Sequence, residues 1–260
     1  MTHPLIARLR LMTRLSEGEL TSIVQACSAT QSFVAGADIA PQGHQPSGFH
    51  IVVEGWAGRY NILTDGRRQF PALCLPGDVC DLDGLLLQRI QSGICALTAC
   101  KMVVLPHALI RDLMDRNTAI RDAFWWLQSV ENAIATEWSV GLGRRSAEEK
   151  TAHLLCEILT RLRMVGLSVG DGCAFPLTQA EIGDVLGLST VHVNRTLTDL
   201  RSMGLIDIKG RWLRILDFAT LKETGNFDPG YLHLEGLKRS LGPDHLSVHA
   251  MSTDLQMPAR

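Results

Sequence analysis

The segment from Pro176 to Ile206 constrains the fold most strongly, because it predicts two helices joined by a tight turn. Thr178 precedes the first helix and Ser189 the second, and each side chain can accept a hydrogen bond from a free backbone amide at the helix start. Gly187 stands between the helices, and glycine adopts the backbone conformation that such a turn requires. The segment is therefore predicted to be a helix-turn-helix.

The two predicted helices have an apolar side and a polar side. The apolar residues that hold the pair together are Ile182, Val185, Leu186, Leu188, Val193, Leu197 and Leu200. Near or on the outer face of the second helix lie Thr190, Val191, His192, Asn194, Arg195 and Thr198. A polar N-terminal half is what a recognition helix presents to base edges in the DNA major groove.

A predicted two-stranded wing follows the second helix, with Lys209-Gly210-Arg211 at its tip. Between Ser189 and Arg214 the sequence contains five basic and two acidic residues, although the whole chain has a formal net charge of -2. A local excess of positive charge suits contacts to phosphates. Double-stranded DNA is therefore the predicted partner of this region.

The first half of the chain has a different pattern, with short β-type runs between turn residues from about residue 31 to 105. Strands are expected near 49–53, 57–63 and 70–75, with turns at Asp65-Gly66 and at Pro76-Gly77-Asp78. Short strands at this spacing indicate a β-barrel or jelly roll. Residues 4–29 have helical spacing and predict one or two short helices before it.

A long amphipathic helix is predicted between the two halves. Its apolar stripe, at steps of three and four, consists of Ile120, Phe124, Leu127, Val130, Ile134 and Trp138. We interpret it as a two-fold dimerisation helix, and the alternative is that the stripe packs on the barrel of its own chain. A hinge is expected at 141–145, before a capping box at Ser146 begins the next helix.

Motifs in both halves together point to one family. In the second half they are Leu177-Thr178-Gln179-Ala180-Glu181-Ile182-Gly183, Leu186-Gly187-Leu188-Ser189, Val193-Asn194-Arg195-Thr196-Leu197 and Gly204-Leu205-Ile206. In the first half they are Phe49, Ile51, Val52, Glu54-Gly55, Asp65-Gly66-Arg67 and Pro76-Gly77-Asp78. The chain resembles the Crp/Fnr (cyclic-AMP receptor protein / fumarate-nitrate regulator) family over about residues 4 to 220.

The resemblance implies an α+β protein with a sensor domain like the cyclic-nucleotide-binding fold, a dimerisation helix and a winged helix-turn-helix. The expected domains are 1–116 for the sensor, 117–143 for the helix and hinge, 144–220 for DNA binding and 221–260 for a C-terminal tail. The function expected is sequence-specific transcription regulation, with a homodimer on a near-palindromic site and RNA polymerase as a further partner. A signal at the barrel would shift the helix and the hinge.

The resemblance also implies which residues contact DNA. Thr190, Val191 and Arg195 occupy positions from which family members read bases, and Arg195 is suited to guanine O6 and N7. The family often has an acidic residue where this chain has Val191, so the preferred half-site should differ. The predicted base readers are Thr190, Val191, His192, Asn194 and Arg195. The predicted phosphate contacts are Thr178, Gln179, Ser189, Lys209 and Arg211.

The residues expected to bind a cyclic nucleotide do not suit cyclic AMP. Family members that bind it use a glutamate for the ribose and an Arg-Ser pair for the phosphate, and here these places hold Asp81-Leu82-Asp83 and Ile90-Gln91-Ser92. Without the arginine, the cyclic phosphate loses its main charge-assisted hydrogen bonds. The effector-pocket candidates that remain are Arg68, Asp81, Arg89 and Thr136.

No cofactor is predicted for the chain. The close N-terminal cysteine cluster of oxygen-sensing relatives is missing, and Cys27 stands alone there, so an iron-sulfur cluster is not expected. No metal site is predicted, whereas a haem ligand stays open because the chain has nine histidines. The cysteines on predicted strands are expected to be small buried hydrophobic residues, with redox use as the alternative.

Composition separates the remaining classes. The sequence is 46% hydrophobic and 20% charged, as in globular proteins, and it lacks a secretory signal pattern and a membrane-spanning run, so a cytoplasmic location without a membrane partner is expected. The scattered cysteines fit a reducing cytosol. The alternatives are a constitutive regulator with a degenerate barrel, an enzyme, for which the sequence offers no catalytic motif, or a module that binds only proteins.

Overall fold

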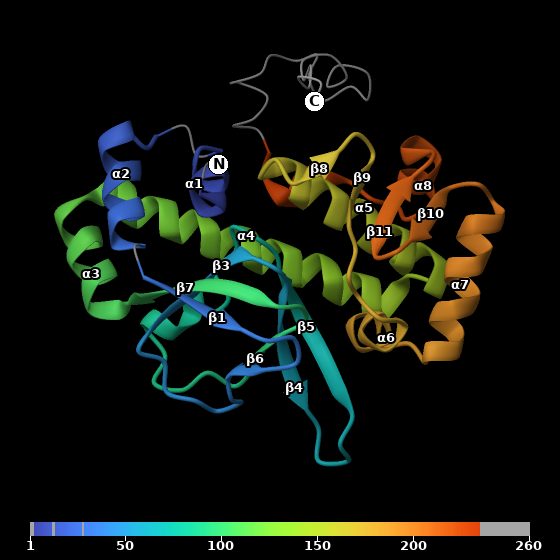
Figure 1. The fold of residues 1–260 in the computed structure, drawn as a ribbon, viewed down its shortest axis with the longest axis horizontal. Coiled ribbons are helices and arrows are strands. Elements are labelled where there is room, and N and C mark those ends of the chain that lie inside the picture. Colours follow the sequence, from blue (N-terminus) through green and yellow to red (C-terminus); the bar gives the residue numbers. More distant parts are fainter. Residues whose placement is uncertain (1–2, 12–13, 28, 235–260) are drawn as a thin grey trace, which may run out of the picture.

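The computed structural model describes residues 3–11, 14–27 and 29–234 and confirms the predicted α+β architecture. Two sheets form the N-terminal domain, which we call the sensor domain after its predicted role. The long helix α4 (Thr118–Arg144) crosses the molecule, and the helix-turn-helix domain lies at its far end (Figure 1). The predicted tail residues 235–260 lie outside the described residues.

Two antiparallel sheets make up the sensor domain, which is a jelly roll rather than the closed barrel also considered. One sheet has the order β1 (Thr30–Phe33), β7 (Cys100–Pro106), β3 (Gly48–Glu54), and the other β2 (Asp38–Ala40), β6 (Gly93–Ala96), β4 (Ala57–Ile62), β5 (Arg68–Cys74). The predicted hairpin is confirmed, because β4 pairs with β5 around Gly66 at φ +85°.

Short helices surround this jelly roll. They are α1 (Pro4–Leu9), α2 (Glu17–Ala26), the 3₁₀ helix η1 (Leu82–Leu85) and α3 (His107–Arg116). The sequence predicted one or two short helices before the first strand, and the structure has two, α1 and α2. Ser16 begins α2 with a capping box, because its hydroxyl accepts from the Glu19 amide while the Glu19 carboxylate accepts from the Ser16 amide. Leu5 and Leu9 of α1 are fully buried against the first sheet.

The structure contradicts the prediction that the apolar stripe of α4 forms the dimer seam. Ile120, Phe124, Leu127, Val130 and Ile134 are all at most 4% exposed within a single chain. Phe124 stacks on Phe49 of β3, with ring centroids 5.8 Å apart. Trp138 is partly buried, packs on an apolar cluster that extends through both halves, and donates to the Glu157 carboxylate at 2.9 Å. The alternative was correct in kind, since a helix buries its most apolar stripe wherever an apolar surface lies.

The C-terminal half contains the predicted winged helix-turn-helix and a larger sheet than expected. After α5 (Ala147–Met164) come α6 (Gln179–Leu186), α7 (Thr190–Ser202) and α8 (Phe218–Thr224). The wing strands β10 (Ile206–Lys209) and β11 (Trp212–Ile215) join β9 (Gly172–Ala174) and β8 (Ser168–Val169) in one sheet of order β10-β11-β9-β8. The 3₁₀ helix η2 (Pro229–Leu232) is the last element of the described chain.

Candidate nucleic-acid interface

The recognition helix α7 begins at Ser189, whose side chain accepts a hydrogen bond from the His192 amide at 3.3 Å. Its buried face holds Val193, Leu197 and Leu200 against the rest of the domain. The opposite face is open: Val191 is 81% exposed, although an aliphatic side chain gains by burial. An exposed valine at the start of a polar helix face is available to a partner.

The predicted base readers gather on this open face. Thr190, Val191, Asn194 and Arg195 are exposed and His192 is partly exposed. The Arg195 Nη2 and the His192 Nε2 lie 3.2 Å apart, one turn of helix from each other. The five side chains therefore form one surface at the N-terminal end of α7.

The turn between α6 and α7 brings the two helices into close contact. Thr178 begins α6 with a capping box, in which its hydroxyl and amide bond to Glu181. Gly187 ends α6 in the left-handed conformation at φ +63°, as the turn motif predicts. At Gly183 a Cβ would lie 2.5 Å from the Leu188 carbonyl oxygen, so only glycine allows this close approach.

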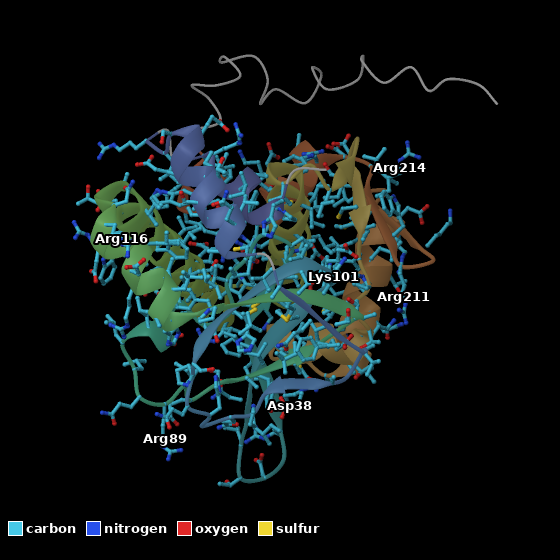
Figure 2. All side chains as sticks on the ribbon, turned by 60° about the vertical axis from the view of Figure 1, so that its left-hand side comes forward. Asp38, Arg89, Lys101, Arg116, Arg211 and Arg214 are labelled. Carbon is cyan, nitrogen blue, oxygen red and sulfur yellow. The ribbon has the colours of Figure 1, made fainter. Side chains whose placement is uncertain are left out.

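The wing places basic side chains at the domain edge. Gly210 and Arg211 turn the chain at φ +56° and +65°, and β10 pairs with β11 from Ile206–Ile215 to Lys209–Trp212. Lys209, Arg211 and Arg214 are exposed, and Figure 2 shows Arg211 and Arg214 at the outer edge of the molecule. Lys209 pairs with Asp207 at 2.8 Å. An ion pair at the surface contributes little free energy, so Lys209 can leave Asp207 and bind a phosphate at low cost.

The four candidate effector residues do not form one pocket, which corrects that prediction. Arg68 pairs with Asp184 of α6 at 2.8 Å, so it joins the two halves of the chain. Asp81 is fully buried and accepts from the His50 backbone amide at 2.8 Å. Arg89 is exposed and donates to the Gly43 carbonyl, and Thr136 lies on the exposed face of α4.

The cysteines of the described chain are free thiols, and most are buried. Burial raises the pKa of Cys27 and Cys95 to about 11 and that of Cys156 and Cys173 to about 12. Thiols with such values remain protonated near neutral pH and react slowly. Within the described residues, no three His, Cys, Asp or Glu side chains gather closely enough to hold a metal ion.

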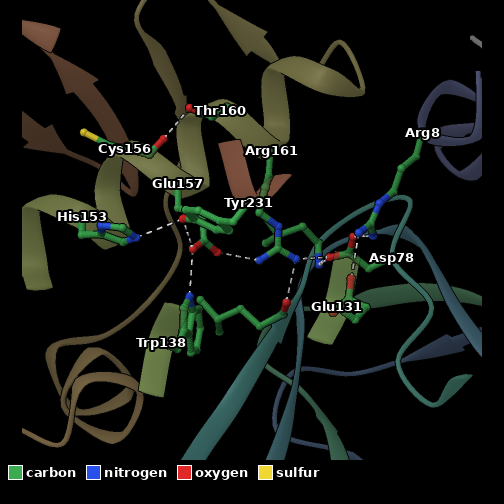
Figure 3. Close-up of polar contacts among 12 residues, drawn as sticks. Arg8, Asp78, Glu131, Trp138, His153, Cys156, Glu157, Thr160, Arg161 and Tyr231 are labelled. Carbon is green, nitrogen blue, oxygen red and sulfur yellow. Dashed lines mark hydrogen bonds and ion pairs between the residues drawn. The ribbon is translucent and has the colours of Figure 1, made fainter. Parts of the chain in front are cut away.

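A buried ionic network, which sequence reasoning missed, connects the two halves of the chain (Figure 3). Asp78, in the turn after β5, accepts from Arg8 of α1 and from Arg161 of α5. Arg8 also donates to Glu131 of α4 at 2.8 Å, and Arg161 to Glu157 at 3.0 Å. The available signal was the spacing of Glu157 and Arg161, an i, i+4 pair within a helix whose buried residues are mainly apolar.

A jelly-roll sensor, a connecting helix and an exposed recognition helix with a basic wing define a DNA-binding regulator. Residues 30–117 match the cyclic nucleotide-binding domain, and residues 149–224 match the Crp-like helix-turn-helix domain. A probable transcriptional activator of Rhizobium leguminosarum bv. viciae is 30% identical over 197 residues, which cover 75% of this chain and 80% of the relative. The chain belongs to the Crp/Fnr family of transcription regulators.

Two further comparisons agree with this membership. The fumarate and nitrate reduction regulatory protein of Vibrio cholerae is 25% identical, and the match covers 84% of this chain and 87% of that relative. The solved structure of FixK2 from Bradyrhizobium japonicum is 26% identical, with a TM-score of 0.68 over 75% of this chain and 96% of that chain. The chain is thus a transcription regulator and not an enzyme.

Proposed function

We propose that this regulator binds a near-palindromic DNA site as a homodimer, with one recognition helix in each of two successive major grooves. The observation that carries the proposal is the open N-terminal face of α7, where Val191 is 81% exposed and Arg195 is exposed beside it. Two such helices about 34 Å apart would contact half-sites one helical turn apart. Such a protein acts where the DNA is, so we expect it in the cytoplasm. In the described part of the chain, every helix is too short or too polar to span a bilayer.

Base reading is assigned to Thr190, Val191, His192, Asn194 and Arg195. Arg195 can donate two hydrogen bonds to a guanine, and the Val191 methyl groups suit the methyl group of a thymine. The Arg195 guanidinium lies against the His192 ring in the free protein, which holds it near the helix face. We therefore expect a half-site that contains one strongly preferred guanine.

Phosphate contact is assigned to Thr178, Gln179, Ser189, Lys209 and Arg211. Thr178 and Ser189 stand at helix starts, where backbone amides and the helix dipole favour an anion. Lys209 and Arg211 extend from the wing. These contacts set the position of the domain on DNA, whereas the bases set the sequence preference.

The dimer seam is assigned to the face of α4 that is left exposed within one chain. Trp125, Ser129, Asn132, Thr136 and Gly143 are exposed and recur at heptad-like steps along this face. Trp125 is 56% exposed, which is unusual for an indole on a helix without a partner. Small side chains after it allow two helices to approach closely, so a second copy of α4 fits this face.

Replacing Thr136 by arginine should convert the dimer to a monomer at micromolar concentration, because two copies of the new charge would meet near the two-fold axis without a counter-ion. Analytical ultracentrifugation measures the change. Ala219→Arg, on the exposed side of α8, adds the same charge away from α4 and should leave the dimer intact. A Thr136→Arg protein that remains dimeric would rule out this seam.

Control by a signal at the sensor domain, with RNA polymerase as the downstream partner, completes the proposal. Selection of random duplexes by the purified, ligand-free protein tests it. Enrichment of a two-fold site by the free protein would support two-fold binding and favour a constitutive regulator over control by a signal. Enrichment only after addition of cell extract would support gating by a ligand. If neither condition enriches a two-fold sequence, the proposal is wrong.

A further inference from the structure

The chain continues beyond its match to the helix-turn-helix domain, which ends at residue 224, and the next ten residues fold back onto α5 and α4. Phe227, Leu232 and Leu234 of this segment are 3%, 1% and 8% exposed. Phe227 and Tyr231 pack around the His153 ring of α5, with centroids 5.1 and 5.8 Å from it. We call residues 225–234 the C-terminal clamp.

The clamp supplies one of the hydrogen-bond donors to a buried carboxylate. Glu157 of α5 is fully buried and accepts from the Trp138 Nε1 at 2.9 Å, from the Tyr231 hydroxyl at 2.7 Å and from Arg161 at 3.0 Å (Figure 3). Trp138 lies on α4 and Tyr231 in the clamp. A buried carboxylate needs all its donors, because no water replaces one that is lost. Glu157 therefore ties α4, α5 and the clamp together.

This carboxylate also connects to the sensor domain. Arg161, which Glu157 holds, donates to the Leu73 carbonyl of β5 at 3.0 Å and to the Asp78 carboxylate. The clamp is thus connected to the sensor half by a series of buried hydrogen bonds through the DNA-binding half. Displacing Tyr231 would loosen Glu157 and, through Arg161, the contact between the two halves.

The clamp also reaches the hinge that separates α4 from α5. Arg145 follows the last residue of α4, pairs with Glu137 of that helix and donates to the Asn226 carbonyl of the clamp at 3.3 Å. The preceding clamp residue, Gly225, lies so close to α5 that a Cβ there would be 2.5 Å from the His153 backbone nitrogen. Its φ of -81° is ordinary, so only this close approach requires glycine.

The clamped arrangement leaves the DNA surface free. The sensor domain contacts the end of α6, where Arg68 pairs with Asp184 and the Gln69 amide donates to the Val185 carbonyl at 2.9 Å. The base-reading face of α7 and the wing remain exposed. We propose that the C-terminal clamp holds the DNA-binding domain at a fixed angle to α4, with Tyr231 as a positioning residue that acts through Glu157, so that two recognition helices match a two-fold site.

This proposal rests on the proposed two-fold binding, and the experiment separates the two. Fluorescence anisotropy of the full chain measures affinity for the selected two-fold duplex and for a duplex with one half-site. Tyr231→Phe should weaken two-fold binding about tenfold, which corresponds to about 1.4 kcal/mol, near the lower limit for one hydrogen bond to a charged group. Gly225→Ala should weaken it at least as much, and half-site affinity should stay unchanged in both variants.

Thr160→Val is the matched control, because it removes a hydroxyl of α5 that bonds only to the Cys156 carbonyl of the same helix. Hydrogen exchange of the 142–146 amides gives a second measurement, and it should speed up in Tyr231→Phe and Gly225→Ala but not in the control. Unchanged or tighter two-fold binding by Tyr231→Phe would overturn the clamp proposal. If the unmodified chain itself prefers no two-fold duplex over a half-site, the proposed function fails instead.

Discussion

Asp78→Asn should lower the free energy of unfolding by about 3–5 kcal/mol, the cost of breaking a buried ion pair by removing one partner. Asp78 is 4% exposed and lies between the guanidinium groups of Arg8 and Arg161, which are also buried. Its carboxylate accepts in addition from the Leu75 amide at 2.7 Å. Asparagine keeps the shape but leaves two positive charges close together in the interior.

The state of Arg161 explains why the effect should be large. Burial favours the neutral form of its side chain, yet the nearby carboxylates of Asp78 and Glu157 outweigh burial and raise the pKa of Arg161 above its usual value. An arginine guanidinium keeps its proton in proteins, so Arg161 stays charged when Asp78 is replaced and cannot lose its proton to relieve the repulsion.

Urea unfolding followed by circular dichroism measures this loss. Asp65→Asn is the control, because Asp65 is exposed and pairs with Arg67 at the tip of the β4–β5 hairpin. Exposed pairs of this kind contribute about 0–1 kcal/mol. A loss below about 1 kcal/mol in Asp78→Asn would mean that this ion-pair network does not hold the two halves together.

Arg195→Ala should weaken binding to the selected DNA site by about 1–3 kcal/mol in each half-site, the range for a bidentate contact to guanine. Two half-sites in one dimer double the effect, so the affinity should fall by at least about thirtyfold. Binding to a random duplex should change little, because phosphate contacts carry most of that affinity. Sequence preference at the guanine position should therefore relax.

Anisotropy titration with the selected and random duplexes checks both expectations. Lys209→Ala offers a contrasting variant on the wing, and it should weaken both duplexes to a similar degree and reduce the salt dependence by about one unit per half-site. Arg116→Ala, which removes an exposed side chain of α3 outside the DNA-binding half, should change neither affinity. Equal loss on both duplexes in Arg195→Ala would show that Arg195 contacts phosphate and not a base.

Local chemistry explains which parts of the fold could be predicted. Ser146 and Thr178 begin helices as capping boxes, and Gly187 ends α6 in the left-handed conformation, because each motif is satisfied by residues within a few positions. The expected hairpin at Asp65-Gly66 follows for the same reason. The helix-turn-helix and the two-part architecture could therefore be predicted from the sequence.

The burial of α4 could not be predicted from its periodicity alone. A stripe such as Ile120, Phe124 and Leu127 has the same spacing whether it faces a second copy or its own sheet. One contact of this stripe comes from β3, which is distant in sequence, because Phe49 of that strand stacks on Phe124. The exposed face, with Trp125 and Thr136, carries the weaker apolar signal.

The surroundings of the effector-pocket candidates and the clamp could not be predicted, because they depend on contacts between residues that are distant in the sequence. Asp81 meets His50 and Arg68 meets Asp184, and both pairings follow from the tertiary fold rather than from a local motif. Tyr231 follows the turn residues Pro229 and Gly230, and its partner, Glu157, is 74 positions away. Resemblance to the family did not reveal the clamp, because the matched domain ends before it.

The affinity of the ligand-free protein for its selected two-fold duplex, measured across a salt series beside a scrambled duplex of equal length, tests the central claim most directly. We expect at least about a thousandfold preference for the selected duplex, as in specific protein–DNA complexes. The logarithm of the affinity should fall linearly with the logarithm of salt concentration, because several phosphates are neutralised. Equal affinity for the two duplexes at every salt concentration, both without and with cell extract, would contradict a sequence-specific regulator.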